Sequence, residues 1–306
     1  MSHSVIATVT PNPAVDYTVL LSETPTAGEV LRTDRTRYDA GGKGINVAKY
    51  LATLGTDTIA TGFLGGFVGE YLDERLSETA VPTEFVEIDG TTRLNTTLLA
   101  PDAEYKINQV GPAVDPSAID LLIESLSVHE PDMVVVAGSL PPGVDAATID
   151  RIAAAGEWET TVDLNGTVLA DLSEGYALCK PNRAELAEAT DRAADSVESA
   201  ISAARSLRDR GFARVVASLG SDGALMVTDD RTLYAPALET DVVDTVGAGD
   251  ALLAGVLSGL TRNDSPENAL RSGVAVATRV VGATGTRVPA LEDVQTLRNS
   301  VSVSSR

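Results

Sequence analysis

The chain has 306 residues, of which 43% are hydrophobic, so it is long enough to bury one large α/β core. Its 44 acidic residues against 23 Lys and Arg give a formal net charge of −21, which makes nucleic acid and anionic membranes poor partners. The one cysteine, Cys179, excludes an internal disulfide, and no apolar run approaches the ~18 residues of a membrane span. We therefore expect a cytoplasmic protein.

The basic residues are four lysines and nineteen arginines. Together with the large negative charge, this composition indicates a protein adapted to concentrated salt, in which a Debye length of ~3 Å at 1 M screens self-repulsion. The alternative is an ordinary acidic protein.

Short β-branched runs alternate with helical patterns along most of the chain. This alternation predicts a mainly parallel sheet covered by helices on both faces, with ligands bound beyond the carboxyl ends of the strands. We expect strands at 5–10, 58–63, 133–137, 160–164, 177–180 and 214–218, and helices at 45–54, 116–126, 146–155, 197–210, 248–260 and 267–281.

Two segments, 14–38 and 84–110, lack a helical period and alternate like strands, as in EVLRTDRTRY at 29–38. They predict a small sheet that stands off the core and can act as a lid. Because a small sheet exposed on both sides is marginal in water, one face should pack on something, for which a second copy of the chain is a candidate. We expect residues 1–306 to form a single domain.

The most informative motif is DTVGAGDALLAG at 244–255. A turn of small residues, Gly247, Ala248 and Gly249, delivers Asp250 onto the first turn of a predicted helix. The unpaired N–H groups of a helix start attract anions, and glycines let that backbone approach a phosphate closely. Asp250 is therefore either an acid that complements the helix dipole or a general base beside an anion hole.

A second glycine turn, GGKGINVAKYLATLG at 41–55, opens another helix. It offers N–H groups at Gly42, the ammonium of Lys43 and the amide of Asn46 to a phosphorylated or polyhydroxylated ligand. It lacks the spacing of a Walker A loop and the setting of the dinucleotide fingerprint. The structural alternative is a helix start with a solvated lysine.

The lid strands carry further polar side chains, among them Arg93 and Asn95 on one face of TRLN. Arg93 either binds a phosphate or protects an exposed strand edge. Lys106 and Asn108 form a similar pair, and Asp16 either holds sugar hydroxyls or caps a turn. In the core, the GSLPPG motif places Ser139 at the carboxyl end of a strand, where ligands bind.

Two later motifs have ordinary structural explanations as well as functional ones. In KPNRAEL, Asn182 and Glu185 have the spacing of a capping box, but Glu185 could instead hold a hydrated Mg²⁺. The SLGSDGA motif at 218–224 suits a hairpin turn and also suits a surface that lies over adenine or ribose.

In order, TPNPAVD, GGKGINVA, TRLN, GSLPPG, KPNRAEL, SLGSDGA and DTVGAGD resemble the PfkB (ribokinase-like) sugar kinases almost from end to end. The resemblance implies a three-layer α/β fold with a β-sheet lid that often forms a dimer interface. It also implies ATP- and Mg²⁺-dependent phosphorylation of fructose 1-phosphate to fructose 1,6-bisphosphate. Tagatose 6-phosphate and fructose 6-phosphate are alternative substrates within the family.

The resemblance also implies roles for individual residues. Asp250 is expected to be the catalytic base, Gly247, Ala248 and Gly249 the anion hole, and Glu185 the Mg²⁺ residue, with a monovalent cation such as K⁺ near the anion hole. The expected sugar-phosphate residues are Asp16, Gly42, Lys43, Asn46, Arg93 and Ser139, and the expected nucleotide residues are Lys180, Asn182, Ser218, Gly220, Ser221, Asp222 and Gly223.

The sequence disfavours two other classes of function. A non-catalytic sugar-phosphate sensor is disfavoured because Asp250 stands within an intact glycine turn. A dinucleotide-dependent oxidoreductase is disfavoured because TPNPAVD follows the first strand where that class carries its glycine fingerprint.

Overall fold

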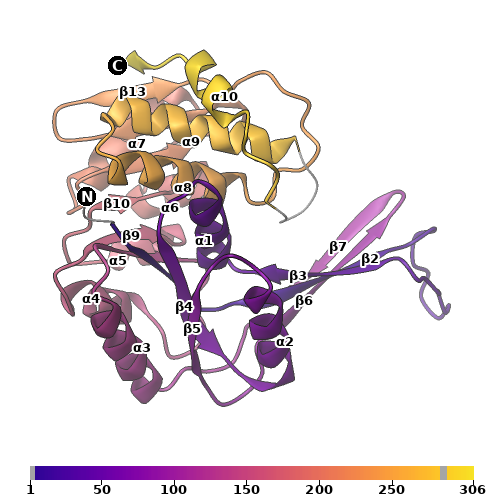
Figure 1. Ribbon diagram of the computed structural model, residues 1–306. Helices are drawn as coiled ribbons and strands as arrows, with labels where there is room; N and C mark the ends of the chain where they lie inside the picture. Colours follow the sequence, from indigo (N-terminus) through magenta and orange to yellow (C-terminus); the bar gives the residue numbers. More distant parts are fainter. Residues whose placement is uncertain (1–3, 283–287) are drawn as a thin grey trace.

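The computed structural model describes residues 4–282 and 288–306 and contains a large and a small sheet (Figure 1). The strands of the large sheet are β1 (Ile6–Thr10), β4 (Thr58–Leu64), β5 (Thr83–Glu87), β8 (Met133–Ala137), β9 (Glu159–Asp163), β10 (Leu178–Cys179), β11 (Val215–Ser218), β12 (Ala224–Val227), β13 (Thr232–Ala235) and β14 (Ser304–Ser305). Their order is β14-β13-β12-β11-β10-β9-β8-β1-β4-β5. Neighbours from β5 to β11 are parallel, and those from β11 to β14 are antiparallel. The predicted mainly parallel sheet is thus confirmed.

Helices cover both faces of this sheet (Figure 1). They are α1 (Lys43–Thr53), α2 (Gly66–Ser77), α3 (Pro116–His129), α4 (Ala146–Ala154), α5 (Gly166–Asp171), α6 (Arg183–Thr190), α7 (Val197–Arg208), α8 (Ala248–Thr261), α9 (Pro266–Val281) and α10 (Val294–Ser300). Along β8, Val134 and Val136 join the buried cluster that includes α3, α4 and α7. Met133 and Val135 join the one that includes α1, α8 and α9. Successive side chains of a strand point to opposite faces, so the apolar run of β8 supplies both cores.

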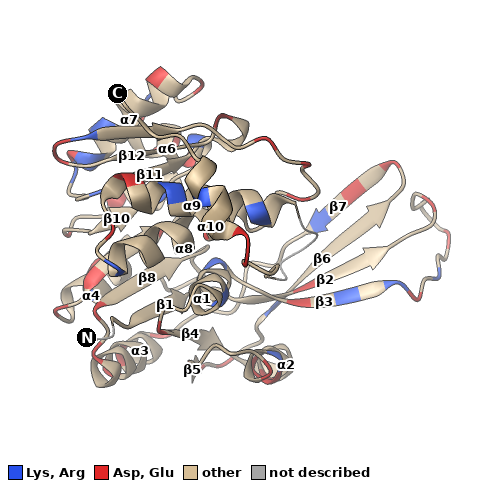
Figure 2. Ribbon diagram, turned by 45° about the horizontal axis from the view of Figure 1, so that its top comes forward, with Lys and Arg blue, Asp and Glu red and all other residues tan. Residues whose placement is uncertain are grey.

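The small sheet, which we call the lid, projects from the core (Figures 1 and 2). Its strands are β2 (Ala14–Leu20), β3 (Thr36–Gly41), β6 (Arg93–Ala100) and β7 (Ala103–Ile107), in the order β3-β2-β6-β7. Asp16 of β2 is directly opposite Asp39 of β3 and Asn95 of β6, so all three lie on one face of the lid. At the base of the lid, Val15 packs into a cluster with α2.

Two details of the predicted lid are wrong. The segment 84–110 begins in β5, which pairs with β4 at the edge of the large sheet and not with the lid. β5 consists of partly buried and exposed residues, as β6 and β7 do, so its local sequence does not distinguish it from a lid strand. The predicted strand at 29–38 starts only at Thr36. Outside the lid, helix α2 at Gly66–Ser77 was not anticipated.

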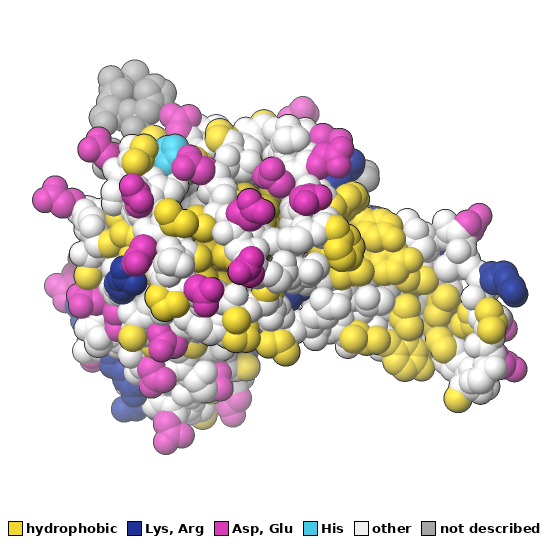
Figure 3. All heavy atoms as spheres, turned by 90° about the horizontal axis from the view of Figure 1, so that it is seen from below, with side chains coloured by type: hydrophobic (Ala, Val, Ile, Leu, Met, Phe, Trp, Pro, Cys, Tyr) yellow, Lys and Arg dark blue, Asp and Glu magenta, His cyan; other side chains and the backbone are white. Residues whose placement is uncertain are grey.

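Acidic side chains are distributed over the outer surface of the molecule (Figures 2 and 3). Among the helices of the described residues, none has the length and apolar character needed to cross a membrane.

Candidate active site

A cavity of about 530 Å³ lies between the lid and the first turn of α8. It stands beyond the carboxyl ends of β1, β8 and β9, which is the expected ligand position in a parallel sheet. The predicted site residues that line it are Asp16, Gly42, Lys43, Asn46, Arg93, Ser139, Lys180, Asn182, Ser218, Gly247, Gly249 and Asp250.

The turn before α8 is built so that only glycine fits well. Gly247 is the N-cap and has a φ of 78°, in the left-handed region that favours glycine. A Cβ there would lie 3.0 Å from the hydroxyl of the buried Tyr50, and a Cβ at Gly249 would lie 3.2 Å from Nζ of Lys180. Gly247 and Gly249 both line the cavity, so backbone without a side chain borders the cavity next to Asp250.

Asp250 stands in the first turn of α8 and is 7% exposed. Asn46 of α1 donates a hydrogen bond from Nδ2 to Oδ2 of Asp250 at 2.9 Å. Burial and then the negative charge of Asp163 raise the pKa of Asp250 to about 6, against the opposing effects of Asn46, Lys180 and Lys43. A buried carboxylate with a pKa near neutrality is suited to accept a proton from a hydroxyl.

Asp163 joins two of the chain's lysines at the floor of the site. It is fully buried at the end of β9, where Oδ1 accepts from Nζ of Lys43 at 2.8 Å and Oδ2 lies 3.1 Å from Nζ of Lys180. Burial raises the pKa of Asp163, but Lys180 and Lys43 outweigh it and hold the pKa below its usual value. Burial also opposes the charge of Lys43, whereas Asp163 and Glu185 raise the pKa of Lys43 above its usual value.

Sequence reasoning did not single out Asp163 as a site residue. The available signal was a carboxylate near the end of the predicted strand 160–164, in the position where ligand-binding side chains gather.

The lid brings its predicted residues to the opposite side of the cavity. Asp16 Oδ1 accepts a hydrogen bond from Nδ2 of Asn95 at 3.0 Å. The guanidinium of Arg93 donates to backbone carbonyls, among them that of Asn12, and so ties β6 to the loop after β1. Asn12 was also not anticipated, and its Nδ2 lies 3.3 Å from Oγ of Ser139.

Lys106 and Asn108, which were predicted to act as a pair, lie in different surroundings. Asn108 lines the cavity, whereas Lys106 is exposed and pairs with Glu104 at 3.1 Å on the same strand.

A second cavity of about 740 Å³ adjoins the first on the other side of the glycine turn. The hairpin from β11 to β12, with its short 3₁₀ turn at Gly220–Asp222, forms one wall, and α9 contributes apolar side chains. The predicted site residues that line it are Asn182, Ser218, Gly220, Ser221, Gly223, Ala248 and Gly249. Because Asn182, Ser218 and Gly249 line both cavities, the two spaces meet beside Asp250.

Two predicted residues have structural partners here. Asp222 does not line either cavity, and its carboxylate pairs with Arg183. Glu185 completes the capping box of α6, in which Oε2 accepts from the backbone N–H of Asn182 at 2.8 Å, while Oε1 lies 3.5 Å from Nζ of Lys43. Within residues 4–282 and 288–306, no group of three or more His, Cys, Asp or Glu side chains could hold a metal.

Comparison with known proteins identifies the family of the chain. Residues 9–293 match the model of the pfkB family carbohydrate kinases. A 1-phosphofructokinase of Haloferax volcanii is 51% identical over 98% of this chain and 98% of its own length. A D-tagatose-1-phosphate kinase of Bacillus licheniformis is 38% identical over 81% of this chain and 83% of its own length.

Solved structures of the same family share the fold of this chain. Phosphofructokinase-2 of Escherichia coli in complex with potassium has a TM-score of 0.89 and 30% identity, and covers 97% of this chain and 98% of its own. A tetrameric inhibited form of the same protein has a TM-score of 0.87 and 29% identity, with the same coverage. The match to the family model over nearly the whole chain, together with these relatives, shows that the chain belongs to the pfkB family of carbohydrate kinases.

Proposed function

We propose that this kinase transfers a phosphoryl group from ATP to fructose 1-phosphate and so forms fructose 1,6-bisphosphate. The observation that carries the proposal is the position of Asp250 beside the glycine turn where the two cavities meet. The lid cavity has the polar lining that a sugar phosphate needs, and the second cavity has the more apolar lining that a nucleotide base needs. The identity to the Haloferax volcanii relative supports the choice of sugar phosphate.

In this mechanism Asp250 accepts the proton of the primary hydroxyl at C6 of the sugar as that oxygen attacks the γ-phosphoryl group. Phosphoryl transfer needs positioning and charge stabilisation more than covalent chemistry. The N–H groups of Gly247, Ala248 and Gly249 stabilise the charge on the phosphoryl oxygens. Lys43 and Lys180, both held by Asp163, place two cations at the junction of the cavities.

The C1 phosphate of the sugar is assigned to the lid side, where Arg93 lines the cavity. Asp16 and Asn95 offer oxygen and nitrogen atoms to the sugar hydroxyls, and Gly42 and Ser139 complete the wall. Nucleotide binding is assigned to the second cavity, to Asn182, Ser218 and the turn at Gly220, Ser221 and Gly223; Asp222 would act there only by orienting the turn through Arg183.

Kinases of this family use ATP with a divalent metal, for which we propose Mg²⁺. Mg²⁺ in kinases takes one or two protein carboxylates and completes its shell with water and phosphate oxygens, so a cluster of three acids is not required. We assign Mg²⁺ to the carboxylate of Glu185, which lines neither cavity but whose Oε1 lies 3.5 Å from Nζ of Lys43, a residue of the lid cavity. When bound, the metal neutralises charge on the phosphates of ATP. The E. coli relative was solved with potassium, so K⁺ is the monovalent cation to test here.

We also propose that two copies of the chain dimerise through the lid. The lid face opposite Asp16 carries Tyr17, Tyr38, Tyr105 and Ile107, and the last three are 49%, 42% and 60% exposed. Figure 3 shows hydrophobic side chains gathered over the lid, whereas charged groups dominate the core surface around it. An apolar face of this kind favours burial against a partner. Ile107→Glu should convert a dimer into a monomer in light scattering; a wild-type monomer would contradict the proposal.

The substrate is tested by a coupled assay with ATP and a panel of sugar phosphates in molar KCl. Fructose 1-phosphate should give the highest kcat/KM, ahead of fructose 6-phosphate and tagatose 6-phosphate. Tagatose 1-phosphate is a second candidate because a kinase named for it is 38% identical to this chain. A preference for a 6-phosphate over both 1-phosphates would contradict the proposed function.

A further inference from the structure

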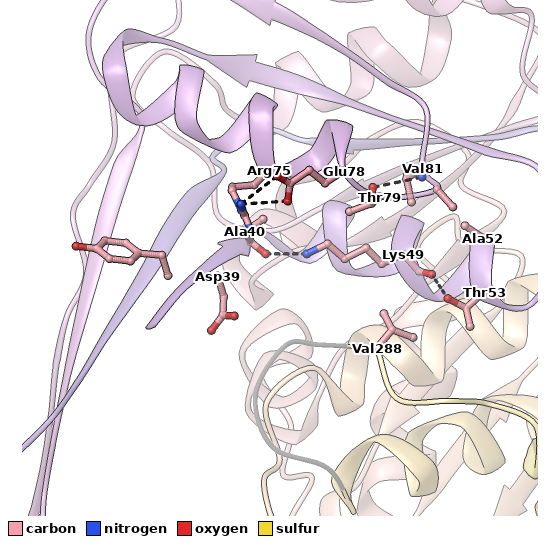
Figure 4. Close-up of a pocket in the computed structure, with 12 residues that line it drawn as sticks. Asp39, Ala40, Lys49, Ala52, Thr53, Arg75, Glu78, Thr79, Val81 and Val288 are labelled. Atoms are coloured by element: carbon pink, nitrogen blue, oxygen red, sulfur yellow. Dashed lines mark hydrogen bonds and ion pairs between the residues drawn. The ribbon is translucent and has the colours of Figure 1, made fainter. Parts of the chain in front are cut away.

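Lys49 lies in a third cavity, of about 500 Å³, on the outer side of the lid base (Figure 4). Its side chain extends from α1 toward the end of β3, where Nζ donates a hydrogen bond to the backbone carbonyl of Ala40 at 2.8 Å. In Figure 4 this bond crosses from the helix to the last residues of the lid strand. Lys49 therefore ties α1 to the point where β3 joins the core.

The strand end held by Lys49 is packed directly against Asp16. A Cβ at Gly41, the residue after Ala40, would lie only 2.2 Å from Oδ2 of Asp16, so backbone at this point touches the carboxylate. Asn95 holds the other oxygen of Asp16 at 3.0 Å. The carboxylate is thus set between the side chain of β6 and the backbone of β3, and a shift of β3 would move it.

Lys49 also acts on Asp16 through its charge. Asp16 and Asp39 are direct cross-strand neighbours, an arrangement that destabilises a sheet when both are ionised. Burial lowers the pKa of Lys49 to about 8, and both carboxylates oppose that change. Burial raises the pKa of Asp16 most, and Asp39 also raises it, whereas the hydrogen bond from Asn95, then Arg93 and last Lys49 lower it.

Among the described residues, the other charged side chains that line this cavity, Asp39, Arg75 and Glu78, have partners of their own. Arg37 pairs with Asp39 on β3. Arg75 and Glu78 of α2 line the same cavity and pair with each other at 3.1 Å. The charge of Lys49 therefore acts on both lid carboxylates from α1, while Nζ itself bonds the carbonyl of Ala40.

We propose that Lys49 is a positioning residue in sugar-phosphate binding. Lys49 holds the end of β3 so that Asp16 stays in place and ionised toward the sugar hydroxyls. The inference rests on the proposed function of Asp16 in binding the sugar. Lys49 lies behind β3 and touches no substrate, so its effect should appear in sugar binding and not in the phosphoryl-transfer step.

The test compares Lys49→Met, Lys49→Gln and Lys49→Arg with Arg75→Gln, which removes the other Lys or Arg that lines this cavity in the described part of the chain. Lys49→Met removes both the hydrogen bond and the charge and should raise the KM for the sugar phosphate about tenfold, with kcat and the KM for ATP changed less than about threefold. Lys49→Gln keeps a donor and should show a smaller increase, and Lys49→Arg should restore most of the affinity. Arg75→Gln should leave the sugar KM unchanged.

The pH dependence of the sugar KM distinguishes an effect of the Lys49 charge from an effect of side-chain packing. In the wild type the sugar KM should rise between about pH 7.5 and 9 as Lys49 loses its proton, and in Lys49→Gln this rise should be absent. If Lys49→Met is unstable, the Lys49→Gln profile alone decides the matter. A sugar KM that is unchanged in both variants, or a loss shared equally by sugar KM, ATP KM and kcat, would overturn the proposal.

Failure of this inference can be distinguished from failure of the proposed function. The variants are assayed on whichever sugar phosphate the wild type uses best, and the readout is the ratio to wild type. A different best substrate overturns the proposed function and leaves the ratio measurable, whereas an unchanged ratio overturns only the role of Lys49.

Discussion

Asn46 donates a hydrogen bond from Nδ2 to Oδ2 of Asp250 at 2.9 Å, although the two residues are 204 positions apart in the chain. The bond joins α1, which follows the lid strand β3, to the first turn of α8, so a side-chain contact connects the sugar side of the site to the helix that begins at the glycine turn. It also stabilises the ionised form of a carboxylate whose burial favours protonation.

Replacing Asp250 with Asn should remove the base with little change of shape. We expect kcat to fall by ~10²–10⁴, as for the loss of a general base, while sugar and ATP bind nearly as in the wild type. Steady-state kinetics and calorimetric titration of each substrate measure the two effects. Near-wild-type turnover in the purified variant would remove Asp250 from the mechanism.

The pH dependence of turnover should reflect the same residue. The pKa of Asp250 is raised to about 6, and only the ionised form, present above that pH, can accept a proton. We therefore expect kcat to be level above about pH 7 and to fall about tenfold per pH unit well below pH 6. A pH–rate profile at saturating substrates provides the measurement, and a level kcat down to pH 5 would contradict the assignment.

Arg93→Ala should affect binding of the sugar phosphate more than catalysis. A phosphate distant from the reacting hydroxyl is held equally in the ground and transition states, so its loss raises KM and leaves kcat nearly unchanged. Lys106→Ala is a matched control, because Lys106 is an exposed lid cation paired with Glu104 outside the cavity. If both variants keep the wild-type sugar KM, Arg93 serves only to tie β6 to the carbonyls that it contacts.

Both activity and the thermal midpoint should rise from dilute buffer to molar KCl. At a net charge of −21, lowering the ionic strength from 1 M to 0.01 M lengthens the Debye length from ~3 Å to ~30 Å, and surface carboxylates then repel one another across the molecule. Anionic substrates are repelled under the same conditions. Equal activity and heat stability in dilute buffer would contradict adaptation to salt. The 51% identity to a Haloferax volcanii protein is consistent with such adaptation.

Sequence patterns predicted the core best where a strand is buried on both faces of the sheet. The apolar run Met133–Ala137 supplies both faces of the sheet and was placed correctly to the residue. β5 was included in the predicted lid segment 84–110 because local sequence does not reveal which neighbour a strand pairs with.

Local sequence patterns were limited in the same way in predicting the active site. Motifs located Asp250, Lys43 and Lys180, since glycine turns and rare lysines stand out in the sequence. Asp163 stands in no such motif, and Asn12 was not singled out within TPNPAVD, because the contacts of both arise only when strand ends meet across the sheet. Lys106 was a candidate for binding, but Glu104 is two residues away on the same strand, so the two side chains share a face and pair outside the cavity.

The most direct test of the account is to identify the product of fructose 1-phosphate and ATP by ³¹P NMR, with ADP measured in the same sample. The account predicts a second phosphomonoester signal coupled to the protons on C6, one ADP formed for each new ester, and neither product with Asp250→Asn. ADP formed without a new phosphoester, or a phosphate added at any other carbon, would contradict it.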